Sequence, residues 1–163
     1  MPTPHHFKAF ASSSNLLLVT KIVTVSSMGI FTGTALCYNA IVMPSLRKFA
    51  STSSLAVWSE MFLLTKPIQV SAIAISALGG SILYYKTHDP FYLLGGMMMA
   101  IIVPYTKLLF DPMDNRLLDI RKHGKDDRGV EEMLMRWDTL HFGRTLLGYG
   151  ATVVTLYAAL RGH

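Results

Sequence analysis

The chain has 163 residues, of which 51% are hydrophobic and only 15% are charged. In soluble domains about a quarter of the residues are usually charged, and a soluble helical bundle repeats polar residues along its outer faces. The net charge of +5 comes from Lys and Arg residues that flank apolar stretches, a layout that suits anionic lipid headgroups. We therefore expect one domain that partners with the lipid bilayer and binds no nucleic acid.

Four stretches are apolar enough to lie inside a membrane, at residues 22–46, 68–85, 91–110 and 145–160. None contains an acidic residue, and Lys107 is their only Lys or Arg. Each approaches the length of about 20 residues that crosses a bilayer as a helix. The sequence predicts an all-α fold, a four-transmembrane-helix bundle in a single domain. We expect the domain to cover residues 1–163 and the spans to lie at about residues 22–46, 68–85, 91–110 and 140–160.

Residues 1–21 contain Lys8 and Lys21 and several serines, and the first acidic residue of the chain is Glu60. This composition is typical of a mitochondrial presequence. It also fits an uncleaved amphipathic segment that leads into the first span. Both interpretations stay open, and the expected location is the mitochondrial inner membrane or the endoplasmic reticulum.

Small residues recur at every fourth position in the first two spans, a spacing that lets helices approach closely in lipid. They are Gly29, Gly33 and Cys37, followed by Ala72, Ser76 and Gly80. We expect both stripes to be helix-packing surfaces. Because proline restricts the residue before it and lacks an N–H, Pro44 is expected to end the first helix and Pro67 to kink or restart the second.

The only long polar connection is predicted at about residues 111–136, between the third and fourth spans. From Val130 a helix can run to Leu160, a length of about 46 Å, which exceeds the bilayer core of about 30 Å. Its first turns must therefore stand outside the membrane. Eleven of the 15 Lys and Arg residues fall on the side of this connection, so the positive-inside rule places it in the cytosol or the mitochondrial matrix.

One face of the fourth helix carries the most distinctive chemistry, because Trp137, His141 and Arg144 occupy positions i, i+4 and i+7. His141 is the best candidate base, since imidazole titrates near physiological pH; it can equally be an interfacial histidine bonded to a carbonyl. Arg144 either stabilises an oxyanion or reaches out to a lipid phosphate. Trp137 either stacks on a planar ligand or belongs to the aromatic belt at the membrane surface.

Two other segments are expected at the same membrane face. They are Tyr105 at the end of the third span and the turn that contains Pro112 and Asn115. No metal site is predicted, because the histidines are scattered and the side chains of Met97, Met98 and Met99 point in different directions on a helix. The sequence also lacks the motifs of covalent haem, of phosphate-binding loops and of serine hydrolases.

The motifs Pro112-x-x-Asn115-x-Leu117 and Trp137-x-x-x-His141-x-x-Arg144, in a chain with four short spans, resemble the anthrone oxygenase family of small integral membrane proteins. The resemblance extends over the whole architecture and is most specific in residues 104–147. It implies a cofactor-independent monooxygenase that oxidises a planar tricyclic anthrone to an anthraquinone with O₂.

The resemblance implies a role for each candidate residue. His141 removes a proton from the substrate, Arg144 and Asn115 stabilise the oxyanion, and the planar rings are flanked by Trp137, Tyr105 and Pro112. The alternative is a different class of protein: a non-catalytic accessory subunit of a larger membrane complex, in which this face binds lipid or stabilises the fold.

Overall fold

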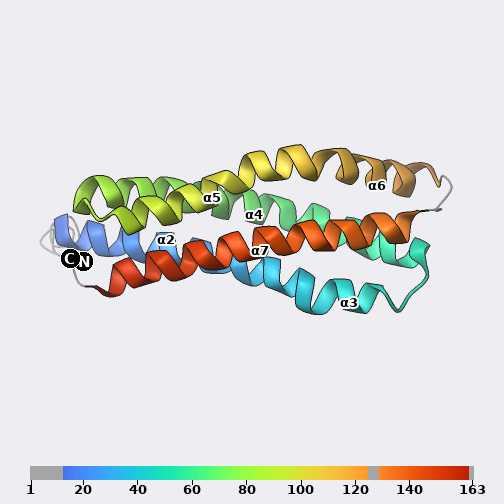
Figure 1. The fold of residues 1–163 in the computed structure, drawn as a ribbon, viewed down its shortest axis with the longest axis horizontal. Helices are drawn as coiled ribbons and strands as arrows, with labels where there is room; N and C mark the ends of the chain where they lie inside the picture. The colour runs from blue at the N-terminus through green and yellow to red at the C-terminus, as the bar shows by residue number, and fades with distance from the viewer. Residues whose placement is uncertain (1–12, 125–128, 162–163) are drawn as a thin grey trace, which may run out of the picture.

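The computed structural model describes residues 13–124 and 129–161, and all their regular elements are helices (Figure 1). Residues 1–12, on which much of the presequence interpretation rests, lie outside the described residues. In chain order the elements are α2 (Ser13–Cys37), the π-helix η1 (Tyr38–Val42), α3 (Met43–Leu46), α4 (Ser51–Thr87), α5 (Pro90–Leu109), α6 (Asp111–His123) and α7 (Val130–Leu160). The prediction of an all-α fold is confirmed.

The helices run side by side along one long axis and group into antiparallel rods (Figure 1). The first rod is α2 with η1 and α3, the second is α4, the third is α5 extended by α6, and the fourth is α7. Each rod packs chiefly against two neighbours, in the cyclic order α2, α4, α5 and α7. The start of α2 and the end of α7 therefore lie at one end of the bundle, and α3 and α6 lie at the other.

Three helices are long and apolar enough to cross a membrane: Asn15–Leu46, Ser51–Thr87 and Pro90–Leu109. Large apolar side chains on their outer faces are exposed, among them Leu64, Leu78 and Leu108, as expected for surfaces that contact lipid. Within the described residues α7 is not among these helices, because Arg144 and several Gly, Thr and Tyr residues dilute its apolar part. The structure thus fits a membrane protein.

The prediction that Pro44 ends the first helix is wrong, because the helical segment continues through Pro44 to Leu46. A proline inside an α-helix leaves the carbonyl four residues earlier without its donor and crowds it sterically. Here the chain passes into the wider π-helix immediately before the proline, and the Met43 N–H donates to the Tyr38 carbonyl. The second proline, Pro67, lies inside the continuous α4.

The connection predicted as a long polar loop is largely helical. Its first half forms α6, with Pro112 in the first turn, where a missing N–H costs nothing. Asp111 and Asp114 lie in the same turn and complement the helix dipole, and Gly124, at φ 57°, ends the helix in the left-handed region. The predicted start of the last helix at Val130 is confirmed.

The second small-residue stripe packs as predicted, with Ala72, Ser76 and Gly80 all buried. A Cβ atom at Gly80 would lie 2.7 Å from the Tyr92 carbonyl oxygen and 2.9 Å from the Gly96 Cα atom. The backbones of α4 and α5 therefore approach closely at this point. The first stripe instead faces outward: a Cβ atom at Gly33 would meet nothing within 4 Å among the described residues.

We predict that Gly80→Ala lowers the free energy of unfolding by about 1–3 kcal/mol, because the new methyl group meets rigid backbone. Gly33→Ala is the matched control and should leave stability unchanged or slightly higher, since alanine favours the helix. Thermal unfolding of both variants in mild detergent measures the difference. Equal midpoints would show that the α4–α5 contact can relax without cost.

Candidate functional site

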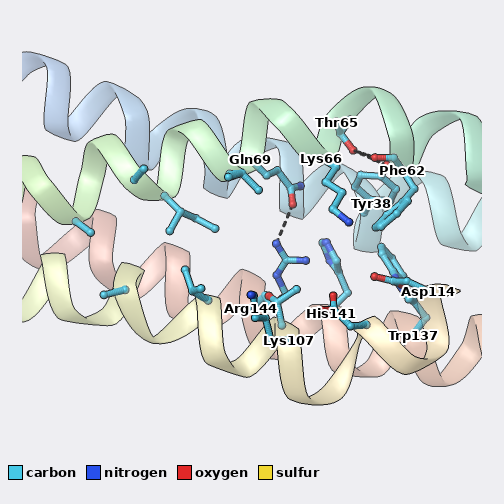
Figure 2. Close-up of a pocket in the computed structure, with 18 residues that line it drawn as sticks. Tyr38, Phe62, Thr65, Lys66, Gln69, Lys107, Asp114, Trp137, His141 and Arg144 are labelled. Carbon is cyan, nitrogen blue, oxygen red and sulfur yellow. Dashed lines mark hydrogen bonds between the residues drawn. The ribbon is translucent and has the colours of Figure 1, made fainter.

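A cavity of about 430 Å³ lies inside the bundle, towards the end that carries α6 (Figure 2). Its lining comes from η1, α4, α5, α6 and α7, and most of it is apolar. The polar groups include Gln69, Asp114, His141 and Arg144. An apolar chamber with a few converging polar groups is the usual form of a small-molecule site.

The Trp137, His141 and Arg144 side chains all line this cavity and are buried, with exposed fractions of 1%, 1% and 6%. They share one face of α7, as the spacing predicted. The Trp137 ring stacks on the His141 ring, with 4.5 Å between centroids and 20° between planes. The Trp137 indole N–H donates to Asp114 Oδ1 at 2.9 Å. The stacking and this bond together fix the indole and restrain the imidazole plane.

Arg144 turns inward instead of reaching the surface of the bundle. One terminal nitrogen of its guanidinium group donates to Gln69 Oε1 at 2.9 Å, and the group lies over the Phe110 and Phe31 rings, 5.3 and 5.6 Å from their centroids. Its Nε atom is buried and has no hydrogen-bond partner among the described residues. A buried cation with a spare donor beside a cavity is suited to hold an oxygen atom of a ligand that carries negative charge.

His141 is held from the side of η1. Its Nδ1 atom lies 3.3 Å from Asn39 Oδ1, and the Tyr38 ring packs 5.3 Å from the imidazole. Asp138, three residues before His141, accepts from the Asn39 amide and pairs with Arg47. The carboxylate therefore contacts the histidine only through Asn39.

The remaining sequence candidates lie outside the cavity lining. Tyr105 is half-buried, and its hydroxyl donates to the Leu140 carbonyl at 3.0 Å. Pro112 and Asn115 are exposed on α6, whereas Asp114 faces inward. Whether these three residues contact a ligand stays a prediction.

Sequence reasoning missed two amide side chains that position this site. Gln69 bonds to Arg144, and Asn39 lies beside His141. A usable signal was present, because each is an amide within an otherwise apolar stretch. Such residues are uncommon inside membrane helices and usually have a polar partner on a neighbouring helix.

Asp114 lies in α6, outside the predicted spans, and is 4% exposed. Burial raises the pKa of its carboxyl group to about 6, although the Trp137 N–H bond and the charges of Lys66 and Arg144 oppose that shift. Asp114 therefore titrates in a physiological range at the polar end of the cavity. Within residues 13–124 and 129–161, no three His, Cys, Asp or Glu side chains gather closely enough to hold a metal ion.

The fold and the cavity together fit a helical membrane protein with a mostly apolar cavity between its helices. The family model described as anthrone oxygenase matches residues 58–154. The chain therefore belongs to the anthrone oxygenase family. The matched segment includes every residue that lines the cavity except Tyr38. Asn39 also lies before the start of this segment. No curated protein and no solved structure matches the chain.

The raised pKa of Asp114 predicts a pH-dependent stability. In the unfolded chain this carboxyl group ionises near pH 4, and in the folded protein near pH 6. Between these values the folded state binds more protons, so stability falls by roughly 3 kcal/mol as the pH rises through this window and is level above it. Unfolding midpoints in detergent between about pH 4 and pH 7 measure the fall.

Asp114→Asn keeps an acceptor for the Trp137 N–H but cannot ionise, so we expect this variant to lose the decline between about pH 4 and pH 6. Glu132→Gln, a change at an exposed carboxylate in the first turn of α7, is the control and should keep the decline. The same decline in Asp114→Asn as in the wild type would contradict the assignment.

Proposed function

We propose that the protein oxidises a planar, polycyclic phenolic substrate of the anthrone type with O₂ inside this cavity. The observation that carries the proposal is the convergence of a buried imidazole, a buried guanidinium and aromatic walls on one apolar chamber. The resemblance of the motifs and the membership of the anthrone oxygenase family support the reaction class.

In the proposed reaction His141 removes a proton from the methylene carbon between the two aromatic rings of the substrate. The resulting anion places negative charge on the carbonyl oxygen, which the Arg144 guanidinium stabilises. The carbanion then adds O₂ to form a hydroperoxide, and loss of water gives the quinone. One anthrone and one O₂ yield one anthraquinone and one water, and each product receives one of the two oxygen atoms of O₂.

The contacts of Arg144 refine the set of residues that serve the oxyanion. Gln69 accepts from the guanidinium and lines the cavity, so it holds Arg144 towards the ligand from the opposite helix (Figure 2). Asn115 is exposed on α6, and we therefore assign the supporting role to Gln69. Phe62, Tyr38 and Trp137 line the cavity and supply the flat surfaces that a polycyclic ring system prefers.

We further propose that α7 is the fourth span and that the substrate enters from the lipid. Several cavity-lining residues are also exposed on the outside of the bundle: Val70 and Ala74 on α4, and Ala100 and Val103 on α5. The cavity therefore opens between α4 and α5 on an apolar surface. A lipophilic polycyclic molecule dissolved in the bilayer reaches such an opening without crossing water.

Replacing the base tests the chemistry. His141→Ala should reduce anthrone-dependent O₂ uptake by about 10²- to 10⁴-fold, the usual contribution of a general base. An oxygen electrode with protein in detergent or vesicles measures the rate, and His123→Ala, an exposed histidine on α6, is the control that should retain it. Full activity in His141→Ala would exclude His141 as the base.

Blocking the opening tests the route. Ala74→Trp should lower kcat/KM for a membrane-dissolved anthrone several-fold, because the indole fills the space between α4 and α5. Ile75→Trp is the matched control: Ile75 is the next residue on α4, is 43% exposed and does not line the cavity. Equal kinetics for the two variants would contradict lateral entry.

The second candidate function is an accessory subunit of a larger membrane complex. One observation favours it: the stripe of Gly29, Gly33 and Cys37 faces outward and no described part of the chain covers its glycines. Small-residue stripes commonly contact another helix in a membrane. Co-migration with a large complex in a native gel would favour the subunit, and migration as a small particle would favour the enzyme.

A further inference from the structure

The π-helix η1 places Asn39 next to the face of α7 that carries His141. A π turn inserts one extra residue into a helix and changes which side chains point inward beyond it, and such turns are frequent at functional sites. Tyr38 and Asn39, at the start of η1, both contact His141. The proposed reaction has no role yet for Asn39, although its side chain makes four hydrogen bonds to residues of α7.

The Asn39 amide is held in one orientation by the acceptors around it. Its Nδ2 atom donates to Asp138 Oδ1 at 2.7 Å and to the Asp138 carbonyl oxygen at 3.1 Å. The other carboxylate oxygen of Asp138 accepts from Arg47. A flipped amide would bring its own oxygen against these two oxygen atoms, so it would lose both bonds and gain repulsion. The orientation therefore follows from the chemistry of its partners.

This orientation turns Asn39 Oδ1 towards α7, where Thr145 Oγ1 donates to it at 2.6 Å. His141 Nδ1 lies 3.3 Å from the same oxygen. An amide oxygen only accepts hydrogen bonds, so the imidazole nitrogen that faces it must carry a hydrogen. A neutral imidazole has one N–H and one lone pair. The lone pair is then on Nε2, the other ring nitrogen.

We propose that Asn39 is a positioning residue that fixes neutral His141 as the Nδ1–H tautomer and so leaves Nε2 as the proton acceptor towards the cavity. Asp138 and Arg47 act one step further out, because they hold the amide that holds the imidazole. The inference deepens the proposed function and rests on it where His141 is the base: the opposite tautomer would present an N–H to the substrate and could not take its proton.

Nitrogen-15 NMR tests the tautomer without any substrate. The full-length protein is labelled with ¹⁵N-histidine in detergent micelles at a pH where His141 is neutral, and its signals are identified by their loss in His141→Gln. The ¹⁵N shifts of protonated and unprotonated ring nitrogens differ widely. We expect a protonated Nδ1 and an unprotonated Nε2 in the wild type, and the reverse pattern would overturn the proposal.

Two variants test the role of Asn39 itself. Asn39→Leu has the same branched shape but no acceptor, so the Nδ1–H population should fall and the Nε2–H form should appear. Thr145→Val is the matched control, because it removes the other donor to Asn39 Oδ1 and leaves the bond to His141 in place; its tautomer should match the wild type. An unchanged tautomer in a folded Asn39→Leu protein would overturn the proposal.

A kinetic measurement separates this inference from the proposed function. If both hold, Asn39→Leu lowers kcat for anthrone oxidation by at least about tenfold with little change in KM, because binding is kept and the base is disabled. Asn39→Gln keeps both the amide oxygen and the amide N–H, so it should retain more of the Nδ1–H tautomer and more of the rate than Asn39→Leu. The expected tautomer together with full activity of His141→Ala would support the tautomer and reject the catalytic base.

Discussion

The burial of the Arg144 guanidinium is the constraint on which the rest of the structure depends. A cation removed from water in an apolar bundle costs several kcal/mol unless protein groups replace its hydration. Here the Gln69 amide accepts one of its bonds, and the Phe110 and Phe31 rings present their faces to the charge. These groups come from α4, from the junction of α5 and α6, and from α2. These three rods must therefore approach α7 at the same level along the axis of the bundle, near Arg144. The cavity is the space that remains between the helices at this level.

The same region combines two departures from regular α-helix that give the site its shape. Pro44 is accommodated by the π turn, which brings Tyr38 and Asn39 against His141. The junction at Phe110 allows α6 to extend the third rod, so that Asp114 reaches the Trp137 indole. Trp137 then stacks on His141. The contacts of His141 are thus set by helix irregularities at the end of the bundle that carries α6.

Much of this organisation was predictable from local patterns. The acid-free apolar stretches predicted the helices, and the i, i+4, i+7 spacing predicted that Trp137, His141 and Arg144 share a face, since both depend only on the period of the helix. The inward face of α6 was not predictable in the same way. The motif drew attention to Asn115, yet the phase of the helix turns its neighbour Asp114 inward. A turn and a helix place these residues differently, and the packing of Leu117 into the core selects the helix.

The sequence by itself determined the class of membrane protein, the polar face of the last helix and the motifs of the anthrone oxygenase family. Only the tertiary structure decided which partners these residues have. Asn39 meets His141 across 102 positions of sequence, and Gln69 meets Arg144 across 75. Such contacts depend on how each rod is rotated about its axis, and that rotation is set by close packing at small residues and by the need to satisfy one buried charge. Neither is visible in the period of a single helix.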